Sequence, residues 1–280
     1  MQFPDCAKVA SERAMKLQPG AIQMMMPSVL RGCALVIALP TRSTDGSGAM
    51  KHITVYLDFI SPYAYLAFVR LPVVLEGISY SVTYRPVLFA GLLEHHGQLG
   101  PAEIACKRTW TYRQALWLAH SMGIAMQMPA THPFNPLPLL RLAVACAGEV
   151  AAGVKSAGPI AVLSPVPSGE ANRQVCETIF NHVWRSGLEA GDAKRLDALA
   201  LALRPAHEVN CPAVKKSLQR NTDDAIAQGI FGVPTFVVDD KIFWGLDALP
   251  MLRDYLCGDP WFAGDGWQSV ENICIGAARK

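Results

Sequence analysis

The chain has 280 residues, 51% of them hydrophobic, and a formal net charge of +2 with acidic and basic residues intermixed. A chain of this length and composition can bury a sizeable core, which excludes a disordered or fibrous protein. Since we find neither a basic stripe nor an apolar run long enough to cross a bilayer, we expect a globular protein that binds neither nucleic acid nor membrane. The substrate therefore has to be inferred from a site.

The eight cysteines include no Cys-x-x-Cys pair and no metal-ligand spacing. Such cysteines are typical of a cytoplasmic protein whose thiols stay reduced and lie mostly in the core. We therefore expect neither a disulfide framework nor a metal site.

Residues 1–49 differ in composition from the rest of the chain. They alternate charged, methionine-rich and small-residue stretches and end in TRSTDGSG at residues 41–48, a sequence typical of a flexible linker. We expect a disordered N-terminal extension, with the folded part beginning at Met50. The alternatives are a targeting segment and a natural start at Met50.

A strand, a helix and a second strand are predicted at the start of the folded part. Residues 53–59 form an apolar run typical of a buried strand, residues 65–75 an apolar run typical of a helix, and residues 78–85 alternate as a strand does. Because a helix links the two strands, this order predicts a right-handed βαβ unit with parallel strands.

A long segment with little strand signal follows, from residue 87 to residue 229. Apolar residues recur at three- and four-residue spacings over residues 102–123, 137–150 and 171–185, which predicts helices with buried apolar faces. The prolines, glycines and small side chains of residues 153–169 predict a loop. We interpret this segment as an inserted helical domain.

Sheet character returns near the C-terminus. Residues 235–238 and 241–244 are short β-rich runs joined by Asp239-Asp240, which predicts a hairpin, and residues 246–257 predict a closing helix. The whole pattern predicts an α/β fold, a thioredoxin-like four-stranded sheet with an inserted all-helical domain. The expected boundaries are 1–49 for the extension, 50–86 and 230–258 for the thioredoxin-like domain, 87–229 for the insertion and 259–280 for a C-terminal tail.

Ser61 and Pro62 lie between the first predicted strand and the first predicted helix. Serine is favoured as an N-cap, and proline is favoured at the first helical position because its missing amide hydrogen is not needed there. A hydroxyl at this point lies at the positive end of the helix dipole, where an anion such as a thiolate is stabilised. Ser61 is therefore either a cap alone or the donor of an anion site.

Pro234 directly precedes the third predicted strand. Proline lacks a ladder donor and suits the end of a strand, and the Val233-Pro234 bond is a candidate for the cis isomer. A cis proline exposes the backbone of the preceding residue, so that an extended peptide can bind there as an added strand.

Three segments resemble the signature segments of a known family. They are DFISPYAY at residues 58–65, FGVPTF at residues 231–236 and FWGLD at residues 243–247. In this order they resemble the 2-hydroxychromene-2-carboxylate isomerases, relatives of the kappa-class glutathione transferases among the DsbA-like thioredoxin folds. The resemblance covers about residues 50–259.

The resemblance implies glutathione as the cofactor and a role for each matched residue. Ser61 would be the catalytic residue that hydrogen-bonds the sulfur, Val233 would pair with the tripeptide backbone, and Asp247 would hold the γ-glutamyl ammonium. The other implied glutathione-binding residues are Pro62, Tyr63, Gln98 and Pro234. Two positions depart from the family pattern, because Gln98 replaces an asparagine and Ala248 an arginine. These two changes affect the expected binding of the tripeptide more than they affect the expected thiolate site at Ser61.

The implied reaction is the isomerisation of 2-hydroxychromene-2-carboxylate to trans-o-hydroxybenzylidenepyruvate in the catabolism of naphthalene-type compounds, by a homodimer that acts on a small aromatic substrate. The alternative is a kappa-like transferase that conjugates glutathione to electrophiles. A module that binds extended peptides at Pro234 is an interpretation of a different class. A thiol-disulfide oxidoreductase is disfavoured, because Ser61 and Ala64 occupy the positions of the two redox cysteines.

Several of these residues also have purely structural interpretations. Asp247 could be only an N-cap, and Tyr63 and Tyr65 could be core aromatics whose hydroxyls have partners. Three histidines lack metal-ligand spacing and are interpreted as loop or surface residues: His95, His96 and His132. Three cations of the first inserted helix are expected mostly in solvent, with one or two able to meet a substrate carboxylate: Lys107, Arg108 and Arg113.

Overall fold

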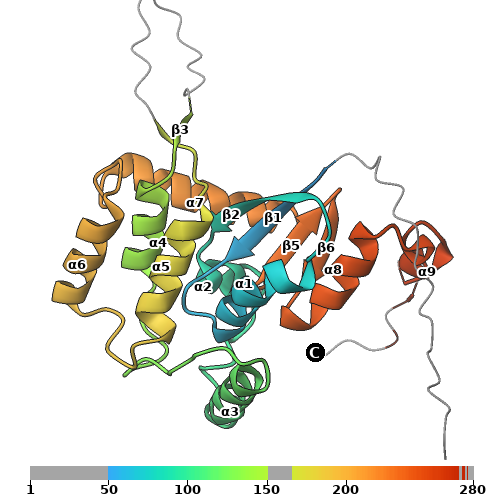
Figure 1. Cartoon of the computed structure of the whole chain (residues 1–280), viewed down its shortest axis with the longest axis horizontal. Helices are drawn as coiled ribbons and strands as arrows, with labels where there is room; N and C mark the ends of the chain where they lie inside the picture. Colours follow the sequence, from blue (N-terminus) through green and yellow to red (C-terminus); the bar gives the residue numbers. More distant parts are fainter. Residues whose placement is uncertain (1–49, 151–165, 271–272, 275, 277–280) are drawn as a thin grey trace, which may run out of the picture. The chain divides into compact units, whose positions relative to one another are not determined.

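The computed structural model describes residues 50–150, 166–270, 273, 274 and 276 (Figure 1). The elements in chain order are β1 (Lys51–Leu57), α1 (Pro62–Val74), β2 (Tyr80–Pro86), α2 (Phe89–His95), α3 (Ala105–Ser121), α4 (Leu137–Ala145), β3 (Glu149–Val150), β4 (Val166–Pro167), α5 (Arg173–Trp184), α6 (Ala193–Leu203), α7 (Pro212–Ala227), β5 (Thr235–Val238), β6 (Lys241–Trp244), the 3₁₀ turn η1 (Leu246–Ala248), α8 (Leu249–Leu256), the 3₁₀ turn η2 (Pro260–Phe262) and α9 (Asp265–Gln268). The predicted extension and most of the predicted 153–169 loop lie outside the described residues.

The predicted four-stranded sheet is confirmed. Its strand order is β2-β1-β5-β6, with β1 parallel to β2 and antiparallel to β5, and β5 antiparallel to β6. The register pairs Ile53 with Val82 across the parallel strands and Val55 with Phe236 across the antiparallel ones. The βαβ unit and the C-terminal hairpin therefore form one mixed sheet.

Alternate residues of β1 face two different hydrophobic clusters. Ile53, Val55 and Leu57 belong to the larger cluster, which contains buried residues of α1, α5 and α8. Tyr56 belongs to a smaller cluster on the opposite face, which includes residues of α2 and α7. In Figure 1, α1 and α8 accordingly lie in front of the sheet. Over Val55, Tyr56 and Leu57 both faces of β1 are buried, which explains why these three consecutive residues are all apolar or aromatic.

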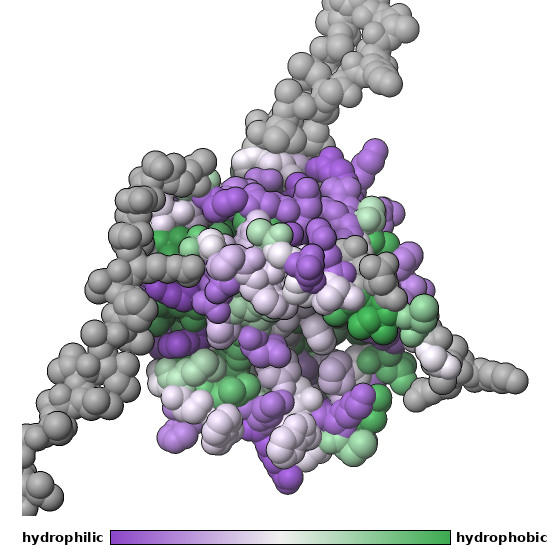
Figure 2. Space-filling model, turned by 90° about the vertical axis from the view of Figure 1, so that its right-hand side faces the viewer, coloured by the Kyte–Doolittle hydropathy of each residue, from purple (hydrophilic) through white to green (hydrophobic). Residues whose placement is uncertain are grey.

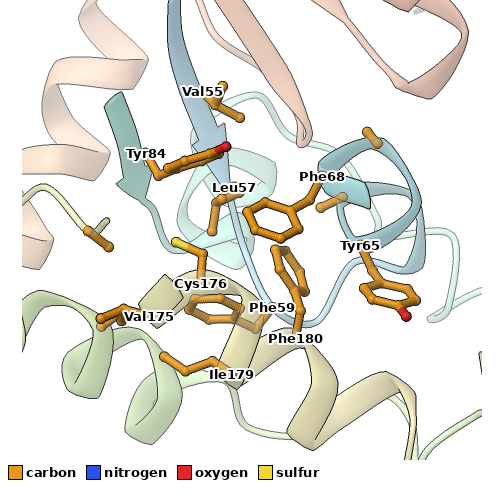
Figure 3. Packing of buried hydrophobic residues seen from close by; sticks show 14 of the residues in the cluster. Val55, Leu57, Phe59, Tyr65, Phe68, Tyr84, Val175, Cys176, Ile179 and Phe180 are labelled. Atoms are coloured by element: carbon orange, nitrogen blue, oxygen red, sulfur yellow. The ribbon is translucent and has the colours of Figure 1, made fainter. Parts of the chain in front are cut away.

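The turn between β1 and α1 is anchored by aromatic packing. Phe59 and Phe180 meet with ring centroids 4.9 Å apart, and Phe68 of α1 lies 5.1 Å from the same Phe180 ring. Figure 3 shows these rings between β1, α1 and α5. Since Phe180 belongs to the predicted insertion, the sheet and the helical segment share one core.

One boundary at this turn differs from the prediction and one confirms it. The strand predicted over 53–59 ends at Leu57, whereas the helix starts at Pro62, as the Ser61-Pro62 pattern indicated, three residues before the apolar run at 65–75. The reason is local, because Ser61 caps the helix and Pro62 occupies its first position. Asp58 and Phe59 therefore belong to the turn.

Among its described residues, the segment 87–229 contains the helices α2 to α7 and also the two-stranded ladder of β3 and β4, so the expected all-helical character needs a correction. The helix predicted over 137–150 ends at Ala145, and Glu149–Val150 pairs antiparallel with Val166–Pro167. The division into two domains stays a prediction, and the described residues all belong to one compact unit.

Residues 259–268, predicted as part of a tail, pack against the sheet domain. Phe262 and Trp267 lie 6.1 and 5.9 Å from the ring of Phe243 on β6, and Phe262 lies 5.2 Å from Tyr255 on α8. Aromatic side chains at this spacing contribute to stability beyond the area they bury. This part of the chain therefore extends the core.

No helix among the described residues is both long and apolar enough to cross a bilayer. On the face shown in Figure 2, hydrophobic side chains form separate patches between hydrophilic and intermediate residues.

The hairpin between β5 and β6 has the predicted bounds and gives a first testable result. Asp239 and Asp240 have positive φ angles of 47° and 64°, as a two-residue type I′ turn requires. Because glycine adopts such angles without a Cβ clash, Asp240→Gly should raise the free energy of unfolding by about 0.5 to 1 kcal/mol in chemical denaturation. Asp239→Gly is the matched control and should not stabilise, since it loses the bond from the Tyr255 hydroxyl at 2.7 Å and the ion pair with Lys51. A destabilised Asp240→Gly would contradict the expectation.

Candidate active site

A cavity of about 900 Å³ lies beside the start of α1. Its walls come from the β1–α1 turn and the start of α1, from α2, α3 and the connection between them, from the segments before α4 and before β5, and from the end of β6. Most of the lining is apolar, and its large side chains are Phe89, Leu93, Trp110, Phe134, Phe231 and Trp244. The side chains with polar or charged groups include Asp58, Ser61, Gln98, Glu103, Lys107 and His132. A site of this size and character can hold a ligand with an apolar part and a few polar groups.

Ser61 lies in the wall of this cavity as the N-cap of α1. Its Oγ accepts the amide hydrogen of Ala64 at 3.2 Å and donates to the carbonyl of Val233 at 3.5 Å, and the residue is 7% exposed. The capping role is thus confirmed. The acceptor of its hydroxyl hydrogen is distant, so the hydroxyl can turn to a better acceptor such as a bound anion.

The structure brings most of the predicted site residues together. Ser61, Pro62, Tyr63, Gln98 and Val233 all line the cavity. Sequence segments from the two ends of the folded chain therefore meet at one place.

Pro234 and Asp247 lie outside the cavity lining. The Val233-Pro234 bond is cis, as predicted, and the carbonyl of Pro234 accepts the amide hydrogen of Gly245 at 2.9 Å. Asp247 is exposed in η1, and α8 begins at Leu249, whose N-cap residue is Ala248 and makes no side-chain capping bond. The interpretation of Asp247 as the N-cap of the last helix is therefore wrong.

The two tyrosines of α1 have different environments. Tyr63 donates to Gln114 Oε1 at 2.7 Å, and burial together with the nearby charge of Asp247 raises the pKa of its hydroxyl. Tyr65 is 2% exposed and donates to the carbonyl of Ala125 at 2.7 Å. Tyr65 is thus a core residue, whereas Tyr63 is accessible to a ligand.

Asp58 was missed by the sequence reasoning. It is fully buried, lines the cavity, and accepts the amide hydrogens of Ile60 at 3.1 Å and Phe89 at 2.9 Å. Burial raises the pKa of its carboxyl to about 7, against the opposing effect of these hydrogen bonds. The available signal was an acidic residue directly after an apolar strand and three residues before the serine.

His132 lies in a loop, as predicted, but the sequence did not indicate that this loop residue reaches the cavity. His132 is half-buried, lines the cavity and contacts the carbonyl of Ile60 at 2.8 Å through Nε2. Burial lowers the pKa of the imidazole, which favours its neutral form. Of the three cations on α3, Lys107 lines the cavity, whereas Arg108 and Arg113 do not.

Within the part of the chain that the structure describes, no group of three His, Cys, Asp or Glu side chains could hold a metal ion. Beside the side chains of Asp58, Glu103 and His132, the cavity offers a helix-capping hydroxyl in apolar surroundings and one lysine at the wall. Such an arrangement suits the stabilisation of a bound anion.

Fold and site together define the chain as a member of the DsbA-like thioredoxin domain family, whose model matches residues 52–257. Within it, the chain is 27% identical to the 2-hydroxychromene-2-carboxylate isomerase of Sphingobium xenophagum over 214 residues, which cover 74% of this chain and 98% of that isomerase. It is 25% identical to glutathione S-transferase kappa 2 of Caenorhabditis elegans over 230 residues, covering 74% and 92% of the two chains.

A solved structure of a 2-hydroxychromene-2-carboxylate isomerase has the same fold. It superposes with a TM-score of 0.59 at 19% sequence identity and covers 80% of this chain and 100% of that chain. These findings confirm the resemblance that the three sequence segments indicated.

Proposed function

We propose that the chain is a glutathione-dependent isomerase that converts 2-hydroxychromene-2-carboxylate to trans-o-hydroxybenzylidenepyruvate. The observation that carries the proposal is Ser61, a helix-capping hydroxyl in the wall of a large apolar cavity with a distant acceptor for its hydrogen. The isomerase relatives, at 27% identity, support this reaction over others of the same fold. The proposal includes a homodimer in the cytoplasm.

The residues around the cavity fit glutathione in part. The volume of about 900 Å³ has room for a tripeptide and a bicyclic substrate. Ser61 would hold the sulfur, Val233 the backbone, and Lys107 a carboxylate. Asp247, outside the lining, is the least supported contact, and Ala248 offers no cation beside it.

Bound glutathione would supply a thiolate nucleophile that adds to a conjugated substrate and then leaves again. Free thiols have a pKa of about 8.5 and are mostly protonated near neutral pH. The Ser61 hydroxyl would donate a hydrogen bond to the sulfur, and the N-terminus of α1 would add its positive partial charge. The apolar walls would exclude water and hold the aromatic rings of the substrate.

A kappa-like transferase is the second candidate function, because the relatives also include kappa-class glutathione transferases at 25% and 23% identity. The two reactions differ in the fate of the thiol. Incubation with the chromene carboxylate and, separately, with a chloro-aromatic electrophile should be followed by product absorbance and by titration of free thiol. We expect rapid isomerisation with no loss of thiol and slow conjugation. Rapid thiol consumption with the electrophile and no isomerisation would establish the transferase instead.

Lys107 provides a test of how the substrate is held. It lies on α3 in the cavity wall, exposed to solvent. If its ammonium pairs with a carboxylate of the substrate or of glutathione, Lys107→Gln should raise the KM of that ligand about three- to tenfold and leave kcat nearly unchanged. Arg113→Gln, on the same helix but outside the lining, is the control and should change neither constant. Equal effects of both variants would show a general effect of charge rather than a contact.

A further inference from the structure

The peptide group between Phe59 and Ile60 is held at both of its polar atoms. The carbonyl of Phe59 accepts a hydrogen bond from Trp184 Nε1 at 3.0 Å, and the amide of Ile60 donates to Asp58 Oδ1 at 3.1 Å. Trp184 is fully buried at the end of α5. Its indole nitrogen is an obligatory donor, so this bond fixes the direction of the carbonyl.

The next peptide group, between Ile60 and Ser61, is held in the same way. The carbonyl of Ile60 lies 2.8 Å from His132 Nε2, and the amide of Ser61 donates to the carbonyl of Asp58 at 3.2 Å. Because a carbonyl can only accept, Nε2 of His132 must carry the hydrogen. Both consecutive groups thus have a ring N–H donor from the helical segment and an acceptor on Asp58.

The orientation of His132 is itself fixed. The Tyr112 hydroxyl lies 2.7 Å from His132 Nδ1 and 2.8 Å from the His132 carbonyl, and with the ring hydrogen on Nε2 both of these atoms are acceptors for the hydroxyl hydrogen. The imidazole packs against Trp184 with ring centroids 5.6 Å apart, and burial lowers its pKa, which keeps it neutral. A partner that fixes the tautomer and orientation of a histidine is a usual feature of functional sites.

We propose that His132 and Trp184 are positioning residues for the thiolate site, because their ring N–H groups fix the two peptide groups that lead into Ser61. This inference rests on the proposed function. The two peptide groups fix the backbone angles of Ile60 and the orientation of the amide that leads into Ser61, whose φ is −86° and ψ 118°. These angles direct the Cα–Cβ bond and so the hydroxyl. A hydrogen bond from this hydroxyl to sulfur weakens with small changes of angle or distance.

The test uses the full-length protein and reduced glutathione as the probe. His132→Phe keeps an aromatic ring but removes the donor, Trp184→Phe does the same at the other carbonyl, and His132→Gln restores a donor. We expect the pKa of the bound thiol, measured from thiolate absorbance, to rise in both phenylalanine variants, and kcat at neutral pH to fall about tenfold. His132→Gln should recover most of this loss.

His182→Phe is the matched control. His182 is also half-buried and contacts a carbonyl, that of Ala190, at 3.0 Å through Nε2, but it does not line the cavity. This variant should lose thermal stability without a shift in the thiol pKa. If His132→Phe behaves like His182→Phe, with lower stability and an unmoved thiol pKa, the positioning role is wrong while the proposed function stands. If His132→Phe does not fold, the thiol pKa and kcat of Trp184→Phe test the positioning role in the same way. If the wild-type protein binds no glutathione thiolate, both the positioning role and the proposed function are wrong.

Discussion

Replacing Ser61 with alanine should lower kcat at neutral pH by about ten- to a hundredfold while the protein stays folded. The loss of one hydroxyl donor removes about 1 to 3 kcal/mol of thiolate stabilisation, since hydrogen bonds to charged groups are stronger than neutral ones. The pH at which activity rises should move upward, because the pKa of the bound thiol is higher without the hydrogen bond from Ser61. Glutathione affinity should change much less than kcat.

The same substitution also removes an N-cap, so its effect on stability needs a matched control. Asn172 caps α5 by accepting the amide hydrogen of Val175 at 2.9 Å and does not line the cavity. Asn172→Ala and Ser61→Ala should each lower the free energy of unfolding by about 1 kcal/mol. Only Ser61→Ala should change the kinetics. Full activity of folded Ser61→Ala, with the pH profile of the wild type, would leave the serine as a cap alone.

Asp58→Asn should destabilise the protein in a manner that depends on pH. At about pH 5, where the wild-type carboxyl is largely protonated, the free energy of unfolding of the variant should be about 1 to 3 kcal/mol lower. The two Asp58 oxygens accept the amide hydrogens of Ile60 and Phe89, and in the variant an NH₂ group, which cannot accept, replaces one of these oxygens. The pKa of the wild-type carboxyl is raised from 3.8 to about 7 by burial. The folded state therefore binds the proton of this carboxyl more tightly than the unfolded state does. The stability that this proton binding contributes is fully present below about pH 4 and is lost as the pH rises to about 7.

The measurement is chemical denaturation of the wild type and of Asp58→Asn at several pH values between about 4 and 8. Taking the difference between the two proteins cancels the titration of all other groups. The free energy of unfolding of the variant should approach that of the wild type as the pH rises. If the difference between the two free energies of unfolding instead increases with pH, the folded protein stabilises the charged form of the Asp58 carboxylate.

The sequence predicted those elements whose signals are local. The hairpin has the predicted bounds because Asp239-Asp240 suits a tight turn, and Ser61-Pro62 marked the start of α1 although the apolar run suggested a later one. The cis bond at Val233-Pro234 was predicted because proline at the edge of a strand has few other placements.

Features that depend on contacts between distant segments could not be predicted. The role of His132 at the turn depends on the carbonyl of Ile60 and on Tyr112, and no spacing in the sequence indicates that the three meet. Similarly, η2 and α9 fold onto Phe243 because of aromatic packing at the end of the chain, where composition alone predicted a tail.

The most direct test of the account is a titration of the wild-type protein with reduced glutathione, following the ultraviolet absorbance of the thiolate as a function of pH. We expect saturable binding with a thiol pKa about one to two units below the free value of about 8.5. Binding with an unshifted thiol pKa, or no binding at all, would contradict the claim that Ser61 and the start of α1 form a thiolate site.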